Sequence, residues 1–140
     1  MSVSFFYLNK YKPFQQTTPV KKWIEQTVAA EKKQAGAINI IFCSDDYLLN
    51  INKQSLNHDY YTDIITFDYC SGKIISGDLF ISTDRVKENA LKFAVPVKKE
   101  FQRVVIHGVL HLLGYKDSND KQQKIMRKKE DEYLQFWAKC

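Results

Sequence analysis

The sequence predicts an α+β fold, in which a small mixed β-sheet of about four strands packs with about five helices. Strand-like and helix-like segments mix along the chain without strict βαβ alternation. The chain has 140 residues, of which 44% are hydrophobic, so residues 1–140 suit one domain that buries roughly two-thirds of its unfolded surface. The segment around His107 is apolar on two sides, so this helix should lie buried near the sheet.

The first half of the chain predicts two strands and two helices. Thr18-Pro19 combines a capping residue with a proline at the first helical position, which predicts a helix start. Gly36 should stop this helix, and Ser44-Asp45-Asp46 should cap the next one. The predicted elements are a strand at 3–8, a helix from Thr18 to about Lys33, a strand at 37–43 and a helix that begins at 44–46.

The second half predicts a β-hairpin followed by three helices. Ser71-Gly72 should form the turn of the hairpin, and Gly77 should mark a bulge or bend in its second strand. Pro96 should end the connection before the apolar helix. The predicted elements are strands at 64–69 and 73–81, a short helix from Ser82 or Thr83, a helix at 97–113 and a last helix from Asn119 or Asp120.

The composition disfavours membrane-spanning and disulfide-framed classes. No apolar run approaches the roughly 18 to 20 residues that cross a bilayer, and the N-terminus lacks the features of a signal peptide. Cys43, Cys70 and Cys140 form no Cys-x-x-Cys pair, which is typical of a reducing cytoplasm. The net charge of +5, carried by 18 lysines and three arginines, fits a polyanionic partner but also fits solvated helix faces.

The stretch from His107 to Asp117 carries the clearest chemical signal. His107 and His111 lie four residues apart in an apolar helical run, so their imidazoles share one face about 6 Å apart. A turn after Gly114 could bring Asp117 back over that face. A single buried histidine is usually a hydrogen-bonded core residue, but one shared cation explains two at this spacing. The pattern predicts a metal site with three protein ligands and an open fourth position, which is typical of catalytic zinc.

Three alternatives stay open for this stretch. The zincin peptidase motif His-Glu-x-x-His has a glutamate base after its first histidine, whereas here Gly108 occupies that position, which disfavours a peptidase. Asp117 could instead be the N-cap of the last helix. Two histidines and one carboxylate also suit non-haem iron, so the metal could be Zn²⁺ or another divalent transition ion.

The segment from His107 to Tyr115, which reads His-Gly-x-Leu-His-Leu-x-Gly-Tyr, resembles the signature of the YbeY family of rRNA maturation factors. Residues 62–67 resemble that family's Thr-Asp/Asn-Val-Leu-Ser-Phe strand, and residues 77–79 resemble its Gly-Asp-Ile. Met126 and Glu130 fall where its last helix carries Met and Glu. The resemblance implies a metal-dependent endoribonuclease that cleaves single-stranded RNA and matures the 3′ end of 16S rRNA. It also implies ribosomal RNA and the small ribosomal subunit, or its assembly proteins, as partners.

Two departures mark the chain as a variant of that pattern. Asp117 stands where the family usually has a third histidine; because aspartate is a competent zinc ligand, the implied ligands are His107, His111 and Asp117. Leu56 stands in the slot of an arginine that the family carries before its strand motif, and a leucine cannot stabilise a phosphate oxyanion. The second departure favours a non-catalytic ribosome-assembly factor with a structural metal, as an alternative to the endoribonuclease.

Another donor could replace the missing arginine. His58 lies close to Leu56 in sequence, and a histidinium can donate to phosphate, so His58 is a candidate catalytic phosphate contact. Arg85 and Arg103 are further candidates, which the sequence cannot place. No side chain is assigned as general base, since RNA supplies its own 2′-hydroxyl as an internal nucleophile.

Overall fold

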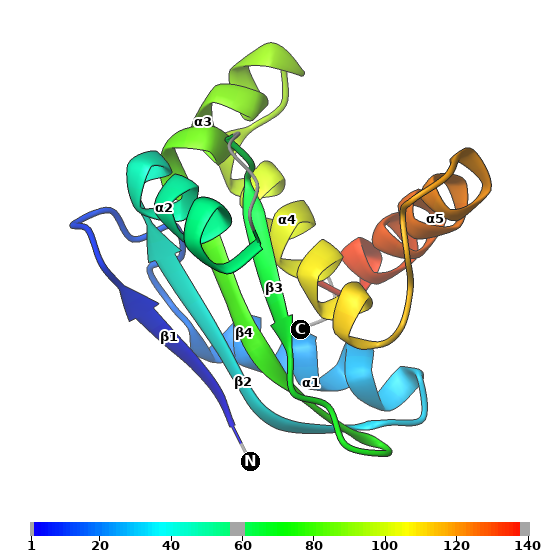
Figure 1. Ribbon diagram of the computed structural model, residues 1–140. Helices are drawn as coiled ribbons and strands as arrows, with labels where there is room; N and C mark the ends of the chain where they lie inside the picture. The colour runs from blue at the N-terminus through cyan, green and yellow to red at the C-terminus, as the bar shows by residue number, and fades with distance from the viewer. Residues whose placement is uncertain (1, 57–60, 138–140) are drawn as a thin grey trace.

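Four strands and five helices make up the computed structural model, which describes residues 2–56 and 61–137 (Figure 1). Their order confirms the α+β class that the sequence predicts. The elements are β1 (Val3–Tyr7), α1 (Thr18–Ala30), β2 (Gln34–Cys43), α2 (Asp45–Leu56), β3 (Ile64–Asp68), β4 (Ile74–Ser82), α3 (Thr83–Lys92), α4 (Val97–Leu112) and α5 (Asp120–Trp137).

The sheet is mixed and has the strand order β1-β2-β4-β3. Strands β1, β2 and β4 run parallel to one another, whereas β3 pairs antiparallel with β4 through the predicted hairpin. Gly72 has a φ of 60° in the turn of this hairpin, a conformation that glycine adopts at little cost. The hairpin therefore places β3 at one edge of the sheet, beside α4 (Figure 1).

The first helix ends earlier than the sequence predicts, at Ala30 rather than near Lys33. Lys32 has a φ of 61°, and the N–H groups of Lys32 and Lys33 donate to Ala29 and Val28 in a helix-ending turn that usually contains glycine. Gly36 consequently lies inside β2, which begins at Gln34. The helix begins at Thr18, as predicted, but Thr17 rather than Thr18 occupies the N-cap position, and the Thr17 side chain makes no capping hydrogen bond.

The predicted bulge lies in a different strand. The register shifts between Ala35 and Ile38 of β2, so the extra residue belongs to β2, while Gly77 pairs regularly with Ile38 and Asp68. A Cβ atom at Gly77 would lie 2.4 Å from the carbonyl oxygen of Phe67 and 2.7 Å from a methyl group of Leu112. Glycine is therefore required there because α4 lies so close to the hairpin.

Helix α4 is the buried central helix that the apolar pattern predicts. Phe101, Val105 and Leu110 are fully buried in a hydrophobic core that also includes residues of α1, α5 and one face of the sheet. A smaller cluster on the other face joins Leu48 of α2 to Cys43. A Cβ atom at Gly108 would lie 2.7 Å from Ile64, so this glycine allows α4 to approach β3 closely.

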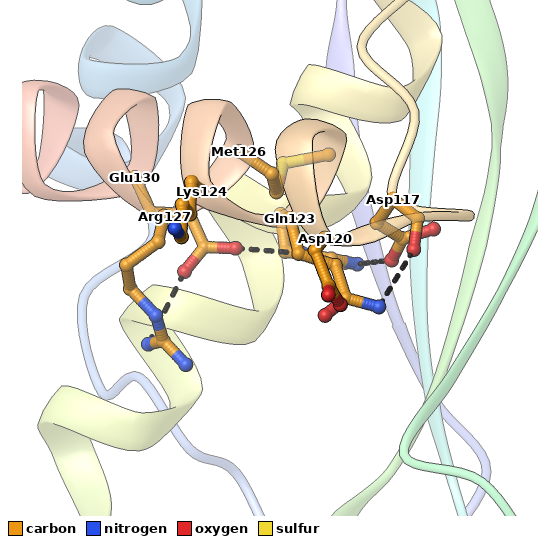
Figure 2. Close-up of a pocket in the computed structure, with 8 residues that line it drawn as sticks. Asp117, Asp120, Gln123, Lys124, Met126, Arg127 and Glu130 are labelled. Carbon is orange, nitrogen blue, oxygen red and sulfur yellow. Dashed lines mark hydrogen bonds and ion pairs between the residues drawn. The ribbon is translucent and has the colours of Figure 1, made fainter.

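The connection from α4 to α5 turns the chain back over the end of α4. Gly114 has a φ of 103°, and the N–H groups of Gly114 and Tyr115 donate to His111 and Leu110, which forms a Schellman motif. Figure 2 shows Asp117 beside the first turn of α5. Within the described ranges, none of the helices has the length and apolarity needed to cross a membrane.

Candidate metal centre

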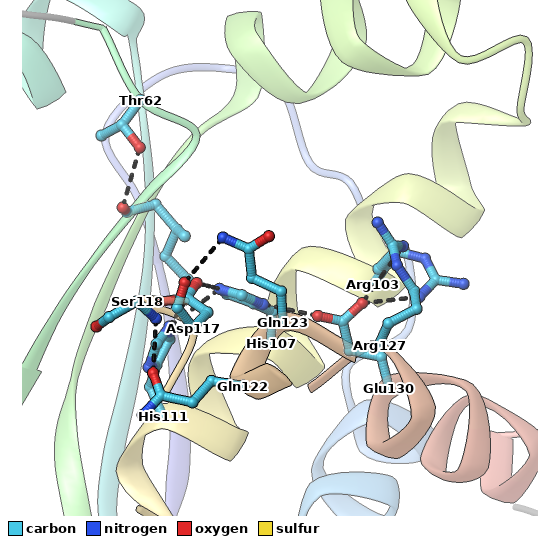
Figure 3. Close-up of polar contacts among 11 residues, drawn as sticks. Thr62, Arg103, His107, His111, Asp117, Ser118, Gln122, Gln123, Arg127 and Glu130 are labelled. Carbon is cyan, nitrogen blue, oxygen red and sulfur yellow. Dashed lines mark hydrogen bonds and ion pairs between the residues drawn. The ribbon is translucent and has the colours of Figure 1, made fainter. Parts of the chain in front are cut away.

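His107 and His111 extend from the last turns of α4 toward the carboxylate of Asp117 (Figure 3). The Nε2 atoms of the two imidazoles are 3.0 Å apart. Oδ2 of Asp117 lies 3.3 Å from Nε2 of His107 and 3.4 Å from Nε2 of His111. Two imidazole nitrogens and one carboxylate oxygen thus point at a common position, and such a set could hold one metal ion.

Asp117 reaches this position because its loop is fastened to α5. Its backbone carbonyl accepts a hydrogen bond from Nε2 of Gln123, and the neighbouring N–H of Ser118 donates to Oε1 of Gln122. The side chain of Asn119 accepts from the N–H of Gln122, so Asn119 caps α5. The alternative interpretation of Asp117 as the N-cap is therefore wrong, and its carboxylate faces the histidines.

A buried carboxylate holds the other side of the His107 ring. Nδ1 of His107 lies 2.7 Å from Oε2 of Glu130, whose side chain is 6% exposed. The other oxygen of Glu130 accepts from Nη1 of Arg103 at 2.7 Å (Figure 3). Arg103 also donates to Asp131. An ionised carboxylate only accepts hydrogen bonds, so Nδ1 carries the proton and the lone pair of Nε2 faces the cluster.

The surroundings shift the pKa values of these groups in opposite directions. Burial raises the pKa of Glu130, but hydrogen bonds from His107 and Arg103 outweigh it and hold the pKa below its ordinary value. Burial lowers the pKa of His107, yet the hydrogen bond and charge of Glu130 raise it above 6.5. For His111, burial and then the charge of His107 lower the pKa. The carboxylate of Glu130 is thus ionised at neutral pH.

Two cavities of about 580 Å³ each meet at the cluster, and His107 and Asp117 line both. We call them the β3 cavity and the α5 cavity. In addition to the cluster, the β3 cavity is lined by Asn52, Leu56, Thr62, Asp63, Ile64, Ile65, Thr66 and Asp68. The α5 cavity is lined by Asp120, Gln123, Lys124, Met126, Arg127 and Glu130.

The β3 cavity contains the variant position of the chain. Leu56, at the end of α2, is 42% exposed and lines this cavity, so the slot that the family pattern assigns to arginine does face the cluster. Burial raises the pKa of the Asp63 carboxyl, which lines the same cavity. His58 lies outside the described residues.

The two predicted arginine candidates are engaged elsewhere. Arg85 pairs with Asp45 at 2.7 Å and lies outside the residues that line either cavity. Arg103 is held by Glu130 and Asp131, so it supports His107 and is not directed at a substrate. Neither guanidinium replaces the missing arginine at Leu56.

Sequence reasoning missed the role of Glu130 and the position of Arg127 beside the cluster. Glu130 was matched to the family pattern without a role, and its contact with His107 spans 23 positions. One signal was available, because Glu130 falls on the same face of α5 as the buried Met126 and Tyr133, and a charged side chain on such a face needs a partner. Arg127 precedes Glu130 by about one helical turn and lines the α5 cavity.

Comparison with known proteins gives a consistent result. A family model described as Endoribonuclease YbeY matches residues 7–138. A protein of Flavobacterium psychrophilum named Endoribonuclease YbeY is 48% identical over 135 residues, which cover 96% of each chain. Its namesake from Karelsulcia muelleri is 46% identical over 98% of this chain and 96% of its own. The solution structure of TM1509 from Thermotoga maritima, 29% identical, superposes with a TM-score of 0.70 over 96% of this chain and 88% of that one.

Proposed function

This chain belongs to the endoribonuclease YbeY family, and we propose that it is a metal-dependent endoribonuclease specific for single-stranded RNA. Its role would be rRNA processing, including maturation of the 3′ end of 16S rRNA, and ribosome quality control. The observation that supports this proposal best is the convergence of His107, His111 and Asp117 between two open cavities. A substrate strand can reach this position from either side.

The proposed ligands of the metal are the Nε2 atoms of His107 and His111 and a carboxylate oxygen of Asp117. Two imidazoles and one carboxylate form a ligand set that zinc accepts in catalytic sites, and other divalent transition ions accept it as well. When bound, such an ion supplies Lewis acidity toward a phosphodiester oxygen and lowers the pKa of a coordinated water toward about 7. Zn²⁺ is our proposed cofactor.

The protein side chains orient the reacting groups. Glu130 holds Nδ1 of His107 and keeps its Nε2 directed at the cluster. The two cavities accommodate the strand on both sides of Asp117. The 2′-hydroxyl of the substrate supplies the nucleophile, which removes the need for a glutamate at Gly108. We retain His58 as a proposed phosphate contact.

The proposed partners are ribosomal RNA and the small ribosomal subunit or its assembly proteins, and the proposed location is the cytoplasm. The net charge of +5 supports a polyanionic partner. Phosphate contacts dominate such binding, so the affinity for RNA should fall steeply as the salt concentration rises.

A non-catalytic ribosome-assembly factor is the second candidate, and Leu56 favours it. This side chain lines the β3 cavity, where an arginine would face a phosphate group. In such a protein the metal would stabilise the connection between α4 and α5 without activating a substrate.

An RNA cleavage assay separates the two candidates. The zinc-loaded wild-type protein and its His111→Ala variant are incubated with a single-stranded fragment from the 3′ end of precursor 16S rRNA, and with the same fragment in a duplex. The wild type should cleave only the single strand, and loss of one proposed ligand should reduce the rate by at least about 100-fold. Equal cleavage by both proteins overturns the enzymatic proposal, whereas RNA binding without cleavage supports the assembly factor.

The metal content tests the ligand set separately. Protein purified without a histidine tag should contain about one equivalent of metal, as elemental analysis measures, and Asp117→Ala should contain much less. A variant that retains the wild-type affinity would remove Asp117 from the proposed ligands.

A further inference from the structure

The α5 cavity adjoins the candidate metal centre on the side away from the hairpin. His107 and Asp117 form part of its wall. Lys124 and Arg127 of α5 form another part (Figure 2). The two cations are three residues apart, so they share one face of the helix. A strand that crosses the cluster and enters this cavity therefore meets two positive side chains within one helical turn.

Arg127 differs from the other two arginines of the chain in its availability. Its side chain is 64% exposed, and its guanidinium lies 3.5 Å from Glu130. Glu130 already has closer partners, since His107 and Arg103 each lie 2.7 Å from it. Arg103 and Arg85 are only 27% and 26% exposed, and each has a carboxylate at 2.7 Å. Arg127 is thus the arginine best able to bind an external anion.

The β3 cavity offers no comparable charge among its described lining residues. They include the carboxylates of Asp63 and Asp68 and the apolar Leu56, but neither lysine nor arginine. The α5 cavity is also lined by the carboxylate of Asp120, so its positive charge is confined to the end formed by Lys124 and Arg127. The positive charge next to the cluster therefore comes from α5.

We propose that the Lys124 and Arg127 end of the α5 cavity is a phosphodiester-binding subsite, which holds the RNA phosphate next to the one at the metal centre. This inference rests on the proposed function and specifies that the RNA strand passes from the metal centre into the α5 cavity. The planar guanidinium of Arg127 matches two phosphate oxygens in a fork, and the ammonium of Lys124 adds a point charge. The subsite supplies from α5 the cation that Leu56 cannot supply from α2.

RNA affinity tests this subsite with a matched control on the same helix. A fluorescent single-stranded RNA with 2′-O-methyl groups, which block the internal nucleophile, is titrated with wild type, K124Q/R127Q and K121Q/K128Q while anisotropy is recorded. Lys121 and Lys128 are exposed but lie outside both cavities, and their replacement removes the same charge. The cavity variant should bind about 10-fold or more weakly, and the control within about 2-fold of wild type.

The salt dependence gives a second readout. The slope of log affinity against log salt should decrease by about 0.7 for the cavity variant, because the subsite holds one phosphate and each lost phosphate contact removes roughly 0.7 on single strands. Equal losses in both double variants, or wild-type affinity in K124Q/R127Q, would overturn the subsite. A zinc titration accompanies each variant, and unchanged zinc affinity is expected because neither Lys124 nor Arg127 offers a ligand.

Failure of the proposed function would look different. It would appear as absence of RNA cleavage by the zinc-loaded wild type, whatever the variants bind. The subsite fails if the wild type cleaves RNA while K124Q/R127Q retains its RNA affinity.

Discussion

Glu130 shows how one buried residue controls the chemistry of another. It is buried, and both of its oxygens are engaged, one by His107 and one by Arg103. A neutral glutamine would keep the shape, but its amide has one acceptor oxygen and one donor nitrogen. It could therefore accept a hydrogen bond from only one of the two partners, His107 or Arg103. The carboxylate therefore sets the tautomer of His107 as well as the direction of its ring.

We expect Glu130→Gln to weaken zinc binding by about 10- to 100-fold, as measured by competition with a chromophoric chelator. Asp131→Asn is the matched control, because Asp131 contacts Arg103 at 2.8 Å but is not a partner of His107 in the described contacts. The control should bind zinc as tightly as the wild type. Equal affinities for all three proteins would show that Glu130 does not orient the ligand.

The candidate site could be predicted from the sequence only where its members are local. The spacing of His107 and His111 follows from helix periodicity, and Gly114 signals the turn that returns Asp117. Glu130 comes from another helix, so its contact depends on how α5 packs on α4. No local rule gives that packing, so the contact of Glu130 with His107 was found only in the structure.

At the scale of the elements, α4 packs closely against the sheet at Gly108. Glycine inside a helix usually costs about 1 kcal/mol relative to alanine, so Gly→Ala at an exposed helical site stabilises a protein. Here a Cβ atom would lie 2.7 Å from Ile64 and 3.0 Å from Leu79. Gly108→Ala should therefore destabilise the fold by about 1–3 kcal/mol in urea unfolding. A gain in stability would show that the sheet yields to the extra methyl group.

Glu31 joins two further elements, and its charge makes that link depend on pH. At the end of α1 it accepts hydrogen bonds from the hydroxyl groups of Tyr115, at 2.7 Å, and of Tyr133, and Lys129 lies 3.5 Å away. Burial raises the pKa of Glu31, but the hydrogen bonds of the two tyrosines and the charge of Lys129 hold it below 4.5. The ionised form is therefore the one that the fold stabilises.

A group whose pKa is lower in the folded state than in the unfolded state stabilises the fold at pH values above its unfolded pKa. This contribution is lost as the pH falls through the folded pKa. Glu31→Gln should thus cost about 1–3 kcal/mol at pH 7, and the difference from wild type should shrink as the pH falls below 4.5. Urea unfolding at several pH values measures it. Glu132→Gln, which removes a more exposed carboxylate near Lys129, should show a smaller cost, and a pH-independent cost at Glu31 would refute the linkage.

Element boundaries were predicted less well than element types. The hairpin and α4 follow from turn residues and apolar periodicity, which are local signals. The end of α1 depends on Lys32 in a left-handed conformation, which is uncommon for a residue other than glycine and cannot be predicted from the sequence. The bulge falls in β2 because the register with β4 requires an extra residue there, and register is a property of two strands together.

At the scale of the whole molecule, the candidate metal centre connects α4 to the last helix. His107 and His111 lie on α4, Asp117 lies on the connection, and Glu130 fixes His107 from α5. A bound ion would thus link groups that separate when the chain unfolds. Because the unfolded chain lacks this arrangement, metal binding adds to the free energy of unfolding.

We expect zinc to raise the melting temperature of the wild-type protein by about 10 °C at 100 times its dissociation constant. Mass action gives about 2.7 kcal/mol at that excess, and 1 kcal/mol shifts a domain of this size by roughly 3–5 °C. Differential scanning fluorimetry measures the shift, and a chelator should reverse it. Mg²⁺ at the same concentration should have little effect, since it prefers oxygen ligands. His111→Ala should lose most of the zinc shift; an equal shift in that variant would mean that the stabilising ion binds elsewhere.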